Sequence, residues 1–190
     1  MVGQIVLIYN TPIHLFMQSS EEKTYISLDL TSPCLNTEVP NNVSWLNLKD
    51  SPIHNDFILK KIKKFILIFN QQVPWRENIT IDDVYKFLFN GNDINILIQN
   101  SDFIGWAWQN KKEGDFVFLK SHQFYTSKLL IDRKFLFKKT NKHITLWWIQ
   151  QLKKFYKKQQ FTQAVAYVDS WNKGVLKSLL KAGYEIKNWN

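Results

Sequence analysis

The residues of this sequence best suited to binding chemistry are basic side chains concentrated between positions 128 and 158. This stretch contains ten lysine and arginine residues against a single acid, Asp132, and its excess equals the net charge of +9 of the whole chain. Such a concentration favours an anionic partner: a phosphorylated cofactor, a nucleic acid or an acidic protein. A solvated helix face that only aids solubility explains the same pattern equally well. The charge therefore indicates a class of partner without choosing one.

Residues that carry metal or nucleophilic chemistry are few and poorly spaced. The four histidines, at positions 14, 54, 122 and 143, lack metal-ligand spacing, and the single cysteine, Cys34, excludes an internal disulfide or a cysteine-rich zinc site. The sequence has no Walker loop, His-Glu-x-x-His motif, dinucleotide glycine fingerprint or nucleophile elbow. We therefore expect no metal cofactor.

Length and composition indicate one domain over residues 1–190. With 45% apolar and 15% aromatic residues, a chain of 190 residues can bury a substantial core and is not a disordered protein. Its longest apolar run, 65–69, is far shorter than the roughly 20 residues of a membrane helix. The first residues lack the features of a secretory signal. We expect a soluble, cytoplasmic protein without a membrane partner.

Hydrophobic periodicity and turn signals divide the chain into helices and strands. Residues 1–48 mix strand-like runs at 4–9 and 23–30 with turn-rich stretches, which predicts an irregular, partly β amino-terminal extension. Helical spacing and capping signals predict helices over 56–70, 80–89, 144–158 and 172–182. Alternation and short apolar runs predict strands over 93–99, 103–108, 115–119, 128–137 and 164–168.

The last four predicted elements alternate strand, helix, strand, helix, and Gly183 ends the final helix. In open α/β sheets, ligands bind at the loops that follow the carboxyl ends of the strands. We therefore expect a ligand site at the loops after 128–137 and 164–168.

Two segments of the carboxyl-terminal half carry a recognisable pattern. Asn172 follows a buried strand and begins a helix that ends in Lys181-Ala182-Gly183-Tyr184, and upstream a polar turn precedes Ile104-Gly105 within 100–108. These segments resemble the Lys-x-Gly-(Phe/Tyr) helix end, without an insertion, and the Ile-Gly hairpin of the GNAT superfamily of acyl-CoA N-acyltransferases. The resemblance covers about 80–190. It implies an α/β (α+β) fold, with a mixed, mostly antiparallel sheet and helices on both faces.

This resemblance also implies a binding site for acetyl-CoA or another acyl-CoA. The family's phosphate loop, (Gln/Arg)-x-x-Gly-x-(Gly/Ala), corresponds to 140–145, where Thr140, His143 and Thr145 replace the usual residues. Either nearby lysines supply the charge that holds the phosphates, or the loop no longer takes CoA. The strands 128–137 and 164–168 should diverge to admit the pantetheine arm. The implied cofactor-binding residues are Phe135, Leu136, Phe137, Lys139, Asn141, Lys142, His143, Ile144, Thr145 and Asn172.

By the same resemblance, catalysis is direct attack of an amine on the thioester, assisted by a general base and a general acid. Asp132 is the only acid in 128–137 and is therefore the candidate base, although an ion pair with Arg133 or Lys134 also explains it. Leu179 occupies the position where many relatives have a tyrosine that acts as the general acid, so Tyr125, Tyr156 and Tyr184 are candidate substitutes if the fold brings them near.

The function that these observations favour is N-acyl transfer, most simply of an acetyl group from acetyl-CoA to a small primary amine. Trp106 and Trp108 share one face of a strand, and such an aromatic surface suits an amino sugar. One alternative is a carrier-protein-dependent acyltransferase whose basic stretch binds an acidic carrier. Another is a non-enzymatic or tRNA-acting protein. The chain has only two arginines, which argues against base-specific nucleic-acid recognition. A homodimer also stays open.

Overall fold

The computed structural model describes residues 23–50, 55–73, 77–111, 119–136, 143–169 and 172–187. Its strands are β1 (Lys23–Asp29), β2 (Val43–Asn47), β3 (Asp93–Gln99), β4 (Asp102–Asn110), β5 (Gln123–Ile131), β6 (Gln163–Asp169) and β7 (Glu185–Ile186). Its helices are α1 (Asp56–Gln72), α2 (Ile81–Phe89), α3 (Arg133–Leu136), α4 (Ile144–Lys158) and α5 (Lys173–Lys181), with a 3-10 turn, η2, at Leu48–Asp50.

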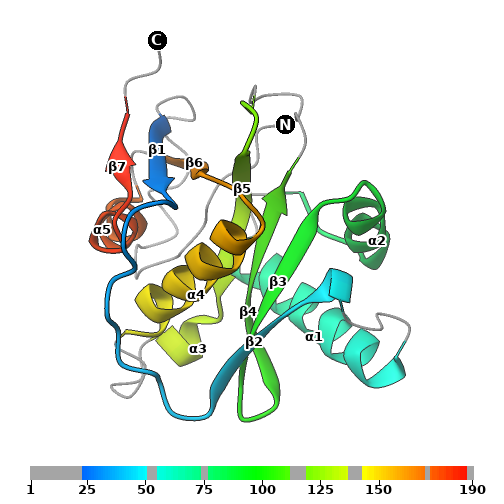
Figure 1. Cartoon of the computed structure of the whole chain (residues 1–190). Helices are drawn as coiled ribbons and strands as arrows, with labels where there is room; N and C mark the ends of the chain where they lie inside the picture. The colour runs from blue at the N-terminus through cyan, green and yellow to red at the C-terminus, as the bar shows by residue number, and fades with distance from the viewer. Residues whose placement is uncertain are drawn as a thin grey trace.

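The strands form one seven-stranded sheet in the order β2-β3-β4-β5-β6-β1-β7 (Figure 1). Neighbouring strands are antiparallel except for β5 and β6, which are parallel. The mixed, mostly antiparallel sheet confirms the predicted fold class. Both described strands of the amino-terminal region belong to this sheet, and β1 lies between β6 and β7. The strand expected over 4–9 lies outside the described residues.

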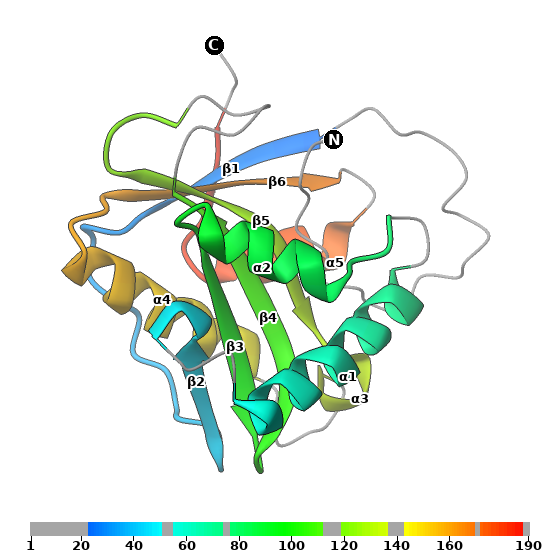
Figure 2. The ribbon, with the colours of Figure 1, turned by 90° about the vertical axis from the view of Figure 1, so that its right-hand side faces the viewer.

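Helices cover both faces of the sheet (Figures 1 and 2). On one face, α4 and α5 bury residues such as Trp148, Ile149 and Leu179 against the sheet. On the other, α1 and α2 pack on Trp106 and Trp108. The two tryptophans share a face as predicted, and both are core residues. In the described part of the chain, no helix is long and apolar enough to cross a membrane.

The helices α1 and α2 begin where the sequence places them because each has a side-chain cap. The Asn55 carboxamide accepts a hydrogen bond from the Phe57 amide. Thr80 and Asp83 form a reciprocal capping box, with the Asp83 carboxylate accepting from the Thr80 amide and hydroxyl. These caps confirm the predicted starts of both helices.

The strand predicted over 128–137 is wrong in its second half. The strand β5 begins earlier, at Gln123, and ends at Ile131. The Asp132 carboxylate accepts a hydrogen bond from the Lys134 amide at 3.2 Å, and its carbonyl accepts from the Phe135 amide at 2.9 Å. Aspartate commonly turns the chain this way, because its short side chain bonds the backbone two residues ahead. The result is the short helix α3. Of the strand predicted over 115–119, only Leu119 is described.

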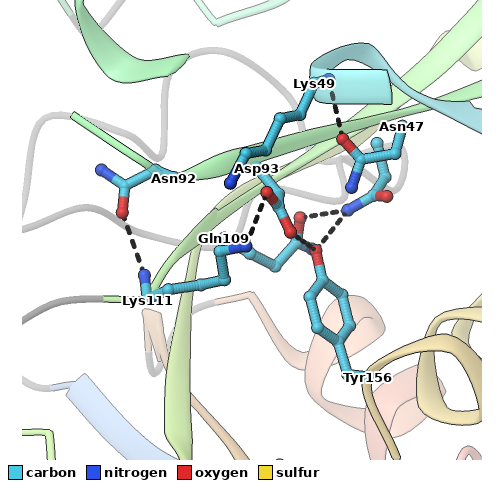
Figure 3. A network of polar contacts seen from close by, with 8 residues as sticks. Asn47, Lys49, Asn92, Asp93, Gln109, Lys111 and Tyr156 are labelled. Atoms are coloured by element: carbon cyan, nitrogen blue, oxygen red, sulfur yellow. Dashed lines mark hydrogen bonds and ion pairs between the residues drawn. The ribbon is translucent and has the colours of Figure 1, made fainter. Parts of the chain in front are cut away.

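A buried polar network joins β3, β4 and α4 (Figure 3). Asp93 is 1% exposed, and its carboxylate lies 2.8 Å from the Lys111 ammonium. The same carboxylate accepts a hydrogen bond from the Tyr156 hydroxyl at 3.0 Å, and that hydroxyl accepts one from Asn95 at 2.8 Å. Burial, followed by the nearby Asp93 charge, raises the pKa of Tyr156 well above its usual value. The network connects β3 and the end of β4 to α4.

Candidate active site

The parallel strands β5 and β6 diverge after a short contact. They pair at three positions only, from Gln123 with Gln163 to Tyr125 with Val165. Beyond these positions β5 continues to Ile131 and β6 to Asp169. The divergence expected from the sequence is therefore present, although it involves 126–131 in place of 128–137. It leaves the edge of β5 that faces away from β4 without a strand partner among the described residues.

A β-bulge lies at the point where the strands separate. On β4, Trp108 and Gln109 are consecutive, whereas their partners on β5 are Lys128 and Thr126, so Ser127 is an extra residue. The Ser127 hydroxyl donates to the Trp108 carbonyl at 3.5 Å. Bulges reorient backbone groups and often lie beside active sites. Here the bulge lies where β5 stops pairing with β6 and continues to pair with β4 alone among the described strands.

Gly105 allows the end of β5 to pair closely with β4. It pairs with Ile131, and a Cβ at this position would lie 2.8 Å from the Leu130 carbonyl oxygen and 3.1 Å from a side-chain carbon of Ile131. We predict that Gly105→Ala lowers the free energy of unfolding by about 1–3 kcal/mol, because backbone must move to accept the methyl group. Urea unfolding measures this loss. An unchanged midpoint and slope of the unfolding curve would contradict the prediction, because β4 and β5 would then accept the methyl group at no cost in stability.

The two helices that come after these diverging strands begin without a cap. The helix α4 comes after β5 and α3 in the chain, and α5 follows β6. Neither has a side-chain cap, at His143 or at Asn172, and neither has an acid in its first turn. The helices α1 and α2 have both. Free amides and a positive helix end attract anions, so these two helix starts are suited to a negatively charged ligand.

Asn172 adds a hydrogen-bond donor at the start of α5. The residue is 4% exposed, and its Nδ2 has no hydrogen-bond partner. The capping role that the sequence allowed is not used, because the side chain makes no cap hydrogen bond. A buried donor without a partner is costly, and ligand atoms commonly supply the missing acceptor. A ligand-binding role for Asn172 stays a prediction, and its buried Nδ2 is available for it among the described residues.

A hollow lies on the opposite face of the sheet, beside α2. Its volume is about 370 Å³. The lining residues come from the connection before α2, from α2 itself and from β4 and β5: Glu77, Asn78, Ile79, Asp83, Lys86, Phe87, Asn90, Trp108 and Lys128. Lys128 is three positions beyond Tyr125, where β5 leaves β6. The hollow thus adjoins the opening from the α2 face, whereas α4 and α5 lie on the other face.

Charged groups in this hollow are held in fixed positions. The Lys128 ammonium lies 4.3 Å from the centre of the Trp108 ring. Hydrogen bonds from Thr80 lower the pKa of Asp83, and the charges of Lys86 and Lys128 act in the same direction, so this carboxylate stays ionised. Sequence reasoning missed this site, since its residues are spread over three elements and form no motif.

Comparison with known proteins connects this geometry to a fold. No family model and no curated protein sequence matches the chain. The chain is similar to a crystal structure of a GCN5-related N-acetyltransferase from Sphaerobacter thermophilus, with a TM-score of 0.60, 11% identity, and coverage of 87% of this chain and 48% of that one. It is also similar to an aminoglycoside acetyltransferase from an uncultured soil metagenomic sample, solved with trehalose (TM-score 0.58, 16% identity, 80% and 95% coverage).

A third similar structure is the glucosamine N-acetyltransferase region of a fungal multi-domain GH3 beta-N-acetylglucosaminidase. Its TM-score is 0.55 at 12% identity, and the match covers 89% of this chain and 20% of that one. The chain has the GNAT fold. The chain spans less than half of the first and third of these proteins, and nearly all of the second.

The residues that the sequence predicts to bind the acyl donor lie in different parts of this GNAT fold. Phe135 and Leu136 lie in α3, so they do not provide the strand backbone expected to pair with a pantetheine arm, whereas 126–131 is the part of β5 beyond its pairing with β6. Ile144 and Thr145 are buried in the first turn of α4, next to exposed His143. The remaining predicted residues, Phe137, Lys139, Asn141 and Lys142, lie outside the described residues.

Asp132, the candidate base, has structural partners. It is 3% exposed, accepts a hydrogen bond from the Gln72 carboxamide at 2.9 Å, and lies 3.5 Å from the Lys134 ammonium. The ion pair with Lys134 is the alternative that the sequence left open. The carboxylate lines a cavity of about 20 Å³ beside α1, large enough for about one water molecule. Its catalytic role stays a prediction.

Tyr125, the candidate acid, lies at the GNAT-fold opening itself. It occupies the last paired position of β5, opposite Val165, and its ring packs against Tyr167 at 6.0 Å. The side chain is buried on the same face as α2. This position is compatible with its predicted role. No cluster of three or more potential metal ligands exists among the described residues.

Proposed function

We propose that this protein is an N-acyltransferase that transfers an acyl group, most simply acetyl from acetyl-CoA, to the primary amine of a small acceptor such as an amino sugar. One observation carries the proposal: β5 and β6 separate after three paired positions, and the helices α4 and α5 that come after them begin without a side-chain cap. An acyl-CoA has an extended arm to fit between strands and phosphates to bind at helix termini. The likeness to GNAT-fold acetyltransferases supports the same donor.

The residues present fit such a donor without a glycine-rich loop. The free edge of β5 over 126–131 offers backbone groups to the amides of a pantetheine arm. The buried Nδ2 of Asn172 lacks an acceptor, which a carbonyl of that arm would supply. The amides at the start of α4 would bind phosphate oxygens.

The proposed reaction is attack of the free amine on the thioester carbonyl. The new bond is the amide C–N bond, the C–S bond breaks, and the thiolate leaves with the electron pair. A backbone N–H of β5 near the bulge at Ser127 would stabilise the negative oxygen. A carboxylate would remove the ammonium proton before attack, and Tyr125 would protonate the thiolate.

The hollow beside α2 is the proposed acceptor site. It adjoins β5 from the face opposite α4 and α5, so amine and donor would meet at the strand from opposite sides. Glu77 is exposed in this hollow and binds neither Lys134 nor Gln72, which hold Asp132. We therefore propose Glu77 as the general base, with Asp132 as the rival candidate.

A pair of asparagine variants tests the donor site. We predict that Asn172→Ala weakens acetyl-CoA binding about 5- to 20-fold, as loss of one hydrogen bond to a ligand does, with little change in stability because no cap is lost. Asn55→Ala is the matched control: it removes the α1 cap, should cost about 1 kcal/mol of stability and should leave donor binding unchanged. Calorimetric titration and urea unfolding provide the two readouts.

The outcome against the proposal is equally definite. If wild-type protein gives no heat with acetyl-CoA at high micromolar concentration, acetyl-CoA is not the donor. If it binds the donor but Asn172→Ala binds equally well, the donor lies elsewhere. Mass spectrometry of mixtures with glucosamine then tests for transfer directly.

An acyl carrier protein is the second candidate donor, because α4 presents exposed lysines near its carboxyl end, Lys154, Lys157 and Lys158. Its phosphopantetheine arm would enter the same opening, and its acidic surface would bind these lysines. Pull-down of acylated carrier that is lost at raised salt, together with no heat from acetyl-CoA, would favour this donor.

A further inference from the structure

The described residues that line the hollow beside α2 carry both signs of charge in equal number. Glu77 and Asp83 are acidic, whereas Lys86 and Lys128 are basic. The charges of these described residues therefore sum to zero, in a protein whose overall charge is +9. A pocket for a polycationic acceptor would need an excess of acids.

The charges are distributed unevenly within the hollow. Asp83 lies within the fields of both Lys86 and Lys128, and its carboxylate is already bonded to Thr80. The wall formed by α2 and β5 consequently has one lysine charge more than it has acids. The remaining acid, Glu77, lies outside this group, on the connection between α1 and α2.

The segment that carries Glu77 is fixed to α1. The Asn70 carboxamide donates to the Ile79 carbonyl and accepts from the Ile79 amide, both at 2.9 Å. Ile79 is buried in the core. Glu77 is therefore two residues from an anchored position, whereas Lys128 lies on β5 against the Trp108 ring, so the two opposite charges come from different elements.

We infer, on the basis of the proposed function, that the acceptor is a zwitterionic amino sugar: a sugar with one primary amine and one anionic substituent, a phosphate or a carboxylate. The ammonium would bind at Glu77 and the anion at Lys128 with Lys86. We do not expect a polycationic aminoglycoside, because its binding would need excess negative charge. The described lining of the hollow has no such excess, and the chain as a whole is positive.

Calorimetric titration of the full chain at low salt, without acyl donor, tests this assignment. The probes are glucosamine 6-phosphate, muramic acid, glucosamine and kanamycin, which supply a phosphate, a carboxylate, no anion and several cations. We expect at least one anionic amino sugar to bind tenfold or more tightly than glucosamine, and kanamycin to bind no better than glucosamine. The phosphate and carboxylate probes distinguish the two anions.

Lysine variants locate the anion. Lys128→Gln should reduce the affinity for the preferred anionic sugar to that for glucosamine, whereas Lys128→Arg should keep the preference. Lys60→Gln removes the same charge from the exposed side of α1, outside the hollow, and should change nothing.

Equal affinity for glucosamine and both anionic sugars, tighter kanamycin binding, or a preference that survives Lys128→Gln would overturn the inference. Because these titrations contain no donor, failure of the proposed acyl transfer appears separately, as absence of product from acetyl-CoA while the affinities persist.

Discussion

Replacing Asp93 with asparagine is expected to lower the free energy of unfolding by about 3–5 kcal/mol, the usual cost of breaking a buried ion pair. The Asp93 carboxylate is almost fully buried, and it serves the Lys111 ammonium and the Tyr156 hydroxyl together. Asparagine keeps the shape but leaves the lysine charge, whose side chain is 16% exposed, without its partner. Urea unfolding followed by far-UV circular dichroism measures the loss.

A surface pair in the same protein supplies the matched control. The Lys61 ammonium and the Asp102 carboxylate lie at the same 2.8 Å separation, but their side chains are 22% and 48% exposed. Solvent screens such pairs, so Asp102→Asn should cost about 0.2–1 kcal/mol. Similar losses for Asp93→Asn and Asp102→Asn would show that the buried network does not stabilise the sheet. Partial recovery in Asp93→Asn with Lys111→Met would support the unpaired lysine as the cause.

Glu77→Gln is expected to reduce kcat by about 100-fold or more, the contribution typical of a positioned general base. The substitution keeps the shape and hydrogen-bonding capacity of the side chain but removes its ability to accept a proton. Steady-state kinetics with acetyl-CoA and an amine acceptor measures the effect. The rate of the variant should also recover as pH rises, because more of the amine is then already deprotonated.

Asp132→Asn separates this role from that of its rival. Because the Asp132 carboxylate binds Gln72 and lies beside Lys134, its replacement should lower stability and leave a larger share of kcat than Glu77→Gln does. The reverse order, with Asp132→Asn nearly inactive and Glu77→Gln active, would return the base to Asp132 and leave Glu77 as a binding residue.

Local signals in the sequence were sufficient for most helices and strands. The helix 144–158 has the predicted bounds, and α1, α2 and α5 agree to within a residue or two, because apolar spacing and caps are short-range properties. The strand predicted over 128–137 failed because apolar residues continue through Phe135 to Phe137, whereas the side chain of Asp132 turns the backbone. A run of apolar residues alone cannot distinguish these outcomes.

The candidate site was predictable only in part. Asn172 and the divergence of two strands followed from a contiguous resemblance near the carboxyl end. The hollow did not, since Glu77, Asp83 and Lys128 are brought together by the packing of α2 on β4 and β5, and no sequence spacing records that packing. The ion pair between Asp93 and Lys111 could not be predicted either, since it depends on how β3 and β4 pair.

The proposed donor site depends on a strand, β1, that is far from it in the sequence. The strand β6 forms one side of the opening, and its other edge is paired along seven residues with β1, about 140 positions earlier in the sequence. A fragment that starts after residue 30 would expose this edge to intermolecular association. Because pairing at such long range slows folding, one edge of β6 would stay without a partner on a newly made chain until β1 pairs with it, and chaperone demand should concentrate at that step.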